Sequence, residues 1–496
     1  MLESLALRVE PIAGECATSL AARLAERNGE PRLRRFCTHM SLPIKDLRLG
    51  ERGCLLRLSK LSGHDLGALT AGTPCQKEAG YFDLGTERIK FSAFLRTTMR
   101  VCPVCVQESG FHQKGLWQLG QIRVCPTHLC LLQSLPRPKL ADDQLDVVTC
   151  ARNRTLAPAT LVKEDVLSLQ NLLLDRLAGR KSGTWLDDMP FHVVALTSEA
   201  FGLMLSKGAK TARSYASDLD WVIAGDMGVK CLRDGPDVFC AALQKIENTR
   251  SYLNAAYRSR FEVFFEWLRD RRDDAGYDPF RDLMRDFVFR SYPIAKGTQV
   301  LGMRNPERLV HDHKSMAKEM RINRASLAKE LIRLGVVNGS LHLATIHSQN
   351  RFIPRNEANQ IARNLRRLMS ATRAAKRLGI TRVLLGELVE EGLIWPYFPK
   401  SAFPPVYHPQ HTYRFYHHLT RHWQSYYEMR EPIPLPTAAR QAKMPLRKVI
   451  KHIYYRDITI TKRKRGPKGI EGLFISATAW ETYVMFLKHL PNLPFE

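Results

Sequence analysis

Cysteines and histidines that could hold a metal ion gather in the segment VCPVCVQESGFHQKGLWQLGQIRVCPTHLCLL, residues 101–132. Four of them follow the pattern C-x2-C-x19-C-x2-H: Cys102, Cys105, Cys125 and His128. Each short pair is typical of a tight knuckle, in which a proline restricts the turn after the first ligand. Zinc prefers thiolate and imidazole ligands, at about 2.3 and 2.0 Å in a tetrahedral site. The spacing therefore predicts one zinc ion held by two knuckles.

The predicted zinc has a structural role, because protein side chains fill all four positions and leave none for water or substrate. A redox C-x-x-C motif would leave Cys125 and His128 without a role, and buried core cysteines would not explain the paired spacing. His112 and Cys130 are spare candidates. We expect Cys130 to pack as a small hydrophobe on a helix that leaves the site. The sequence contains no GxxxxGK[ST], GxSxG or HExxH motif, and we expect no enzyme activity.

The charge of the chain points to a polyanionic partner. Its 496 residues include 75 Lys and Arg against 49 Asp and Glu, which gives a net charge of +26. Nucleic acid is the partner that such an excess favours, since phosphate contacts release counterions. The sequence shows no signal peptide and no apolar run of membrane-spanning length, so we expect a cytoplasmic protein without a membrane partner.

Helical periodicity dominates the chain and convincing strands are few, which predicts a mostly α fold. We expect an N-terminal helical region at 1–97, a zinc-binding module at 98–135, a linker or irregular segment at 136–160, a helical middle domain at 161–300, and helix-turn-helix units at 310–366, 367–430 and 433–496.

The three C-terminal units share one spacing of apolar side chains. An alanine is followed by apolar residues three, five, ten and fourteen positions later, beginning at Ala317, Ala375 and Ala439. This spacing is typical of a helix-turn-helix. A strand-like phrase that leads into a further helix is expected at Phe352, Phe415 and Phe474. In the third unit, ITITKRKRGPKGIEGLFIS predicts a hairpin wing with a basic tip.

Basic side chains of these units are the predicted DNA contacts. On the second helices they are Arg324, Lys329, Arg333, Arg382, Arg447, Lys448 and Lys451. On the wing they are Lys462, Arg463, Lys464, Arg465 and Lys468, for which a solvated loop is the alternative. The middle unit also carries Glu387, Glu390 and Glu391, which phosphate would repel. We therefore expect this unit to act chiefly in packing or protein contact.

The Cys/His segment resembles the TniQ/TnsD family of transposon-encoded target-selection proteins. The matching residues are Cys102, Pro103, Cys105, Trp117, Gln118, Cys125, Pro126, His128, Leu131 and Leu132. The family's N-terminal phrase is similar to PIAGECATSLAARLAERNG, through Pro11, Glu15, Ser19, Leu20, Arg23 and Leu24. Cys16 stands where the family usually has Ser, and a Trp of the family's helix is absent. The resemblance covers residues 8–135.

The resemblance implies a non-catalytic adaptor that recognises an insertion site and recruits the transposon's AAA+ ATPase regulator, which brings in the transposase. The three helix-turn-helix units and the charge favour direct binding to double-stranded DNA. Two alternatives stay open: an adaptor docked on an RNA-guided CRISPR effector complex with little DNA specificity of its own, and a helix-turn-helix transcription regulator. We expect a nucleoid-associated bacterial protein, with a homodimer left open as its assembly.

Overall fold

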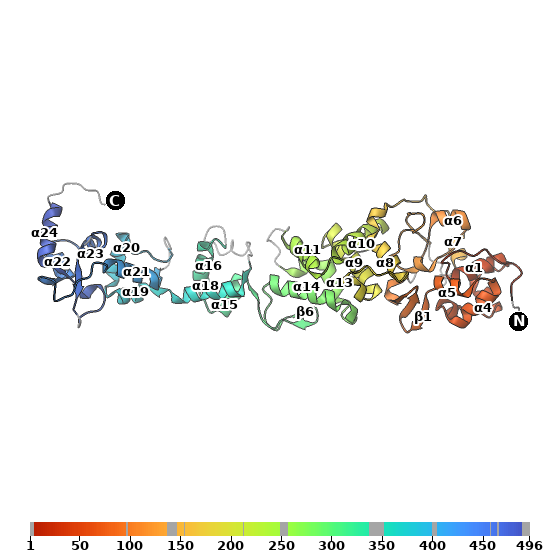
Figure 1. Ribbon diagram of the computed structural model, residues 1–496, viewed down its shortest axis with the longest axis horizontal. Coiled ribbons are helices and arrows are strands. Elements are labelled where there is room, and N and C mark those ends of the chain that lie inside the picture. The colour runs from red at the N-terminus through yellow and green to blue at the C-terminus, as the bar shows by residue number, and fades with distance from the viewer. Residues whose placement is uncertain are drawn as a thin grey trace. The chain divides into compact units, whose positions relative to one another are not determined.

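The computed structural model describes residues 4–95, 98–135, 146–152, 154–211, 213–248, 256–336, 352–398, 404–456, 458–463 and 466–488. Contacts between residues divide the chain into two compact units, Met1–Arg308 and Leu309–Glu496. Helices form most of the regular structure and the strands are short, which confirms the mostly α prediction (Figure 1). No described helix is long and apolar enough to span a membrane.

Five short helices open the first unit: α1 (Ala17–Arg27), α2 (Leu33–His39), α3 (Ile44–Arg48), α4 (Arg52–Ser62) and α5 (Leu66–Gly72). Leu20, Ala21 and Leu24 of α1 are buried on the face that the sequence predicts. A three-stranded antiparallel sheet follows, which the sequence did not indicate. Its strands are β1 (Cys75–Glu78), β2 (Tyr81–Leu84) and β3 (Glu87–Lys90).

The core of this region extends beyond the first 97 residues. Strands β4 (Met99–Val101) and β5 (Gln133–Leu135) pair antiparallel, and side chains of both join the core of the N-terminal helices. Helix α7 (Val147–Ala151) joins it too, capped by Asp146, whose other carboxylate oxygen accepts from the Leu33 amide. Within the segment 136–160, which was expected to be a linker or irregular, four residues of α7 are buried in this core.

The middle of the first unit is helical. Among its described residues are seven α-helices: α8 (Ser168–Leu177), α9 (Phe191–Lys207), α10 (Asp218–Leu232), α11 (Pro236–Asn248), α12 (Tyr257–Arg260), α13 (Glu262–Arg269) and α14 (Asp278–Ser291). The hairpin β6 (Gln299–Val300) and β7 (Met303–Arg304) follows. Helix α9 is buried over most of its length. A Cβ atom at Gly202 or Gly228 would overlap a carbonyl oxygen of the opposite helix, so these glycines allow α9 and α10 to approach closely.

The second unit repeats one arrangement three times, and this confirms the tandem helix-turn-helix prediction (Figure 1). A strand leads into two helices, and a second strand returns antiparallel to the first before a third helix. The first repeat is β8 (Val310–His311), α15 (His313–Glu319), α16 (Arg324–Arg333), β9 (Ile353–Pro354) and α18 (Arg355–Arg367). The second is β10 (Met369–Ser370), α19 (Ala371–Leu378), α20 (Arg382–Glu390), β11 (Val406–Tyr407) and α21 (Pro409–Leu419).

The third repeat adds the predicted wing. It consists of β12 (Pro432–Pro434), α22 (Leu435–Gln441), α23 (Leu446–Tyr455), β13 (Ile460–Lys462), β14 (Leu473–Ser476) and α24 (Ala477–Lys488). Strand β14 lies between β12 and β13 and pairs antiparallel with both. The expectation for Phe415 was wrong: Phe415 lies within α21, and the returning strand of the second repeat is Val406–Tyr407.

The turn between the two helices has the same backbone conformation in each repeat. The residue four positions after the alanine that begins the shared spacing is Arg321, Gly379 or Lys443, with φ of 51°, 64° and 50°. This left-handed residue ends the first helix and lets the chain turn into the second. Only Gly379 avoids the cost of about 1–2 kcal/mol that this conformation imposes on other residues.

Gly379→Ala is expected to destabilise the second unit more than Gly392→Ala. Both glycines have a positive φ, of 64° and 68°, so both substitutions cost about 1 kcal/mol of backbone strain. At Gly379 a Cβ atom would also overlap the Lys468 carbonyl oxygen, whereas at Gly392 it would meet nothing within 4 Å. Thermal unfolding followed by circular dichroism measures the difference. Equal losses at the two positions would show that the Lys468 segment is not held against Gly379.

Candidate functional site

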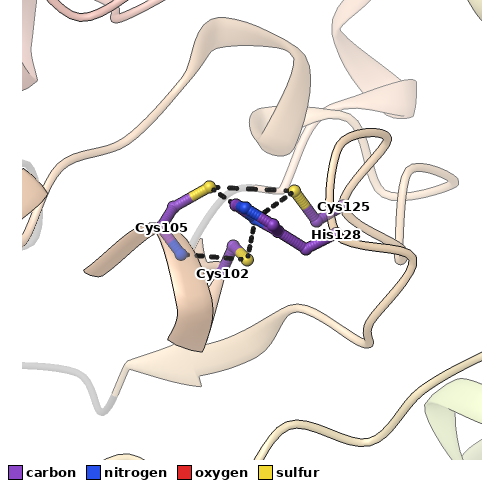
Figure 2. Close-up of side chains that lie close together, drawn as sticks. All are labelled: Cys102, Cys105, Cys125 and His128. Atoms are coloured by element: carbon purple, nitrogen blue, oxygen red, sulfur yellow. Dashed lines mark hydrogen bonds between the residues drawn. The ribbon is translucent and has the colours of Figure 1, made fainter. Parts of the chain in front are cut away.

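The four predicted ligands meet at one point. Cys102, Cys105, Cys125 and His128 place their ligand atoms within 4.8 Å of one another, and the three cysteines are buried. Figure 2 shows the thiols and the imidazole directed towards each other from two separate pieces of chain. The two knuckles predicted from the sequence therefore come together as one cluster, which can hold a metal ion.

Local backbone structure positions each knuckle. Cys102 follows β4 and caps helix α6 (Pro103–Ser109), where its sulfur accepts from the Cys105 amide at 3.4 Å. Proline at the first helical position suits this arrangement because its fixed φ is helical and its missing N–H needs no partner. The second knuckle lies at the tip of a hairpin, between the bridged residues Val124 and Leu131. Its turn closes through Leu129, whose φ is 48°.

The spacing of the four atoms fits a tetrahedral zinc ion. Bonds of about 2.3 Å to sulfur and 2.0 Å to nitrogen place two sulfurs about 3.8 Å apart, and a sulfur and a nitrogen about 3.5 Å apart. The Cys105 and Cys125 sulfurs are 3.8 Å apart. The distances from His128 Nδ1 to the sulfurs of Cys102, Cys105 and Cys125 are 3.5, 3.3 and 3.7 Å. These residues would hold the ion and leave no position for a substrate.

Two of the thiols, those of Cys105 and Cys125, have a raised pKa in the absence of a cation. The hydrogen bond with Cys102, followed by burial, raises the pKa of Cys125 to about 12. Burial also raises the pKa of Cys105. A bound cation offsets this cost, because it stabilises the thiolates that ligate it. Away from the thiols, His128 Nε2 lies 3.2 Å from Glu108 Oε1, an arrangement that fixes the ring with Nδ1 towards the cluster.

The two spare candidates lie differently. Cys130 is buried with its sulfur 3.5 Å from that of Cys102, but it lies outside the set whose ligand atoms all converge. The expected helix after the site is wrong, because residues 130–135 are extended and end in β5. His112 is buried away from the cluster, where its Nδ1 contacts the Gly110 carbonyl at 2.8 Å and its ring lies against Trp117.

A buried polar group joins the Cys/His segment to helix α1. Glu15 accepts from Ser19 Oγ at 2.6 Å and forms an ion pair with Arg23, also at 2.6 Å. Ser19 Oγ in turn accepts from the Gln113 amide at 2.9 Å. Burial raises the pKa of Glu15, and Arg23 and the two hydrogen bonds oppose this effect. The N-terminal phrase and the Cys/His segment are thus parts of one folded body.

A family model for TniQ matches residues 6–132. The chain carries a TniQ domain. Its boundaries enclose both pieces that the polar group of Glu15 joins, and all four ligand candidates. No curated protein matches the chain. The TniQ domain associates the protein with transposition.

The TniQ domain is fixed to the middle helices by buried ion pairs. Arg123 contacts Glu199 of α9 and lies 3.3 Å from Asp218 at the start of α10. Arg100 contacts the same Asp218 oxygen at 3.0 Å and donates to the Gly120 carbonyl. A domain tied in this way to the next helices does not depend on the metal for all of its stability.

The predicted DNA contacts of α16 have protein partners in part. Arg324 is exposed at the start of the helix. Lys329 Nζ lies 5.6 Å from the centre of the Phe398 ring. Arg333 donates to both carboxylate oxygens of Glu330 and lies over Tyr397. Residues 397–398 follow α20, so the second repeat covers part of the second helix of the first.

The basic face of α23 meets the acidic face of the second repeat. Arg447, Lys448 and Lys451 all contact the Glu391 carboxylate, at 3.5, 3.0 and 2.9 Å, and Arg447 also contacts Glu387 at 3.5 Å. Lys451 and Lys448 lower the pKa of Glu391, chiefly through the hydrogen bond from Lys451. In this arrangement the three cations join the third repeat to the second through ion pairs.

The remaining predicted contacts that the structure describes are at the surface. Arg382 is exposed at the start of α20. On the wing, Lys462 lies over Trp423, and Arg463 donates to the Tyr426 hydroxyl at 2.7 Å. Lys468 is exposed near the return of the wing. Lys464 and Arg465 lie outside the described residues.

Sequence reasoning missed a basic face made by exposed residues of the consecutive helices α18 and α19. Its exposed residues are Arg363, Arg366, Arg367, Arg373, Lys376 and Arg377. No carboxylate among the described residues pairs with any of them. The signal was present as strong amphipathicity around the buried Ala358, Ile361, Ala374 and Leu378, but the predicted contacts were confined to the second helices and the wing. The unit that contains this face has 31 Lys and Arg against 13 Asp and Glu, so it carries +18 of the total charge of +26.

Cys125→Ser is expected to release the metal, whereas Cys130→Ser retains it. Cys125 supplies one of the four converging ligand atoms and a hydroxyl is a weaker ligand, while Cys130 lies outside the set. Metal content of the purified full chain, measured by plasma mass spectrometry after a chelator challenge, separates the two variants. Loss of the metal from Cys130→Ser with retention in Cys125→Ser would exchange their roles.

Proposed function

We propose that the protein is a target-site selector of a transposition system that binds double-stranded DNA directly and has no catalytic activity of its own. The TniQ domain supports the association with transposition. The observation that carries DNA binding is the concentration of positive charge in residues 309–496, which also form three helix-turn-helix repeats. The first 308 residues have 44 Lys and Arg against 36 Asp and Glu, a net charge of only +8.

In this proposal the metal is zinc and its role is structural. A set of three thiols and one imidazole favours zinc over harder cations such as magnesium or calcium, which prefer oxygen ligands. The cluster is closed, and it lies between β4 and β5 at the edge of the N-terminal core. Zinc would fix the segment from residue 110 to residue 124, whose regular structure is a single 3-10 helix at Gly115–Gln118, and which also contributes the Gln113 contact to α1.

The DNA-binding surface would centre on α18, α19 and the wing. Cations that no carboxylate neutralises contribute most to counterion release. The segment that returns from the wing packs against α19, since the Glu471 amide donates to the Gly379 carbonyl at 3.3 Å. Exposed Lys468 and the basic residues at the end of α19 therefore come from segments in contact. Arg324 and Arg382, exposed at the starts of their helices, extend the proposed set.

The ion pairs of α23 argue against major-groove reading by Arg447, Lys448 and Lys451 in this arrangement. DNA would have to displace Glu391, whose side chain is only 12% exposed. The expectation that the middle repeat acts in packing agrees with this contact.

We assign recruitment of an AAA+ ATPase regulator to the first unit, because this unit contains the TniQ domain. The test compares how much of the ATPase co-purifies with the full chain and with a variant that lacks residues 1–308.

Neutralising α19 is expected to weaken binding to duplex DNA and its dependence on salt. The triple variant Arg373→Ala, Lys376→Ala, Arg377→Ala should lower the slope of log affinity against log salt by up to about 2.7, at about 0.9 for each phosphate that is no longer neutralised. Fluorescence anisotropy with a labelled duplex between 50 and 200 mM salt, roughly the range in which such interactions dominate, measures the slope.

Arg447→Ala is the matched control, because it removes a cation that already pairs with Glu387 and Glu391. It should change the salt slope less than Arg377→Ala alone. A larger effect of Arg447→Ala would move the DNA-binding surface to α23. Binding of duplex DNA that does not change with salt in the wild type would remove direct DNA binding from the proposal.

A further inference from the structure

A groove in the second unit is lined by aromatic and basic side chains and was not singled out from the sequence. Its volume is about 740 Å³. It lies between α21, the segment Leu393–Trp395 that follows α20, and Tyr454 near the end of α23. The volume falls within the range of about 300–1,000 Å³ that is typical of ligand sites. The groove is therefore large enough for a small planar group to enter.

The aromatic part of the groove has a fixed wall and an exposed rim. Phe415 and Tyr454 stack with their ring centres 5.5 Å apart, and the His418 ring lies 4.4 Å from that of Tyr454. Hydrogen bonds from Arg421 and His418 to the Tyr454 carbonyl hold this wall in place. At the rim, Trp395 and Tyr413 are 62% and 60% exposed, although both are large apolar rings. Exposed rings that lie together along one groove, in contrast to single exposed rings, are typical of a ligand-binding groove.

The charge of the groove selects an anionic ligand. Arg414, Arg421 and three histidines contribute to the lining, and no carboxylate is among the described residues that do. Arg414 is exposed on the same helix as Tyr413. Aromatic rings next to cations are the combination that binds unpaired nucleotides, because the rings stack on the base while the cations contact the phosphate. A paired duplex cannot use the rings, since its bases already stack on each other.

We infer that this groove binds an unpaired nucleotide of the target DNA, as in a single strand or a locally distorted duplex. The inference rests on the proposed function, because it assumes that the second unit contacts DNA. It assigns to that unit a preference for distorted DNA, in which Trp395 and Tyr413 stack on an exposed base and Arg414 contacts its phosphate. The basic face of α18 and α19 would supply affinity for the flanking duplex.

The test compares three labelled probes with the full chain by fluorescence anisotropy: a perfect duplex, the same duplex with one unpaired thymine, and a thymine oligonucleotide. Wild type should bind the bulged duplex more tightly than the perfect one. Trp395→Ala and Tyr413→Ala should weaken binding of the bulged duplex and the oligonucleotide about fivefold or more, the low end for one stacked base. Both should leave perfect-duplex binding unchanged, and Trp395→Phe should restore most of the preference.

Tyr427→Ala is the control, since Tyr427 is 89% exposed in the same unit but does not line the groove. It should behave as wild type. If Trp395→Ala and Tyr413→Ala keep the preference for the bulge, or Tyr427→Ala loses it equally, the groove does not bind the base, while direct duplex binding still stands. If the wild type binds neither the perfect nor the bulged duplex, the proposed function and this inference both fail.

Discussion

The convergence of three thiols and one imidazole is the constraint on which the TniQ domain depends. Two knuckles separated by nineteen residues reach one point, where the hydrogen bond with Cys102, followed by burial, raises the pKa of Cys125 to about 12. A bound cation would offset this cost, because it stabilises the thiolates that ligate it. The intervening segment also makes contacts with the rest of the domain. They include the Gln113 amide on Ser19 and the packing of His112 against Trp117.

The same domain also has a metal-independent attachment. Arg100 and Arg123 are buried and form ion pairs with Asp218 and Glu199 of the middle helices. Removing one member of such a pair leaves a buried charge without its partner, which is strongly destabilising. The cluster therefore shapes one edge of a body whose position relative to the middle helices is set by ion pairs.

Much of the fold and of the candidate site could be predicted from local patterns. The spacing of the cysteines, the buried face of α1 and the three helix-turn-helix spacings are all short-range features, and the structure confirms the helices and the cluster. Contacts between distant residues were not predictable. The pairing of Lys451 with Glu391 requires two repeats to meet. It gives a basic side chain of α23 a protein partner that the local sequence does not reveal. Phe415 was placed in a strand because the spacing of the repeats was assumed constant, whereas the strand of the second repeat begins at Val406.

The three repeats keep their topology while their surfaces differ, and this bears on how tandem helix-turn-helix units can act. Tyr397 contacts Glu330 of α16, and Glu391 contacts α23, so the second repeat covers part of the second helix of both neighbours. Helices that are covered in this way cannot all enter a major groove in succession. Exposed basic side chains that no described carboxylate neutralises lie on the connecting helix α18 and the first helix α19. In the proposed DNA binding, this arrangement favours contact along the phosphate backbone over the reading of bases by three equivalent helices.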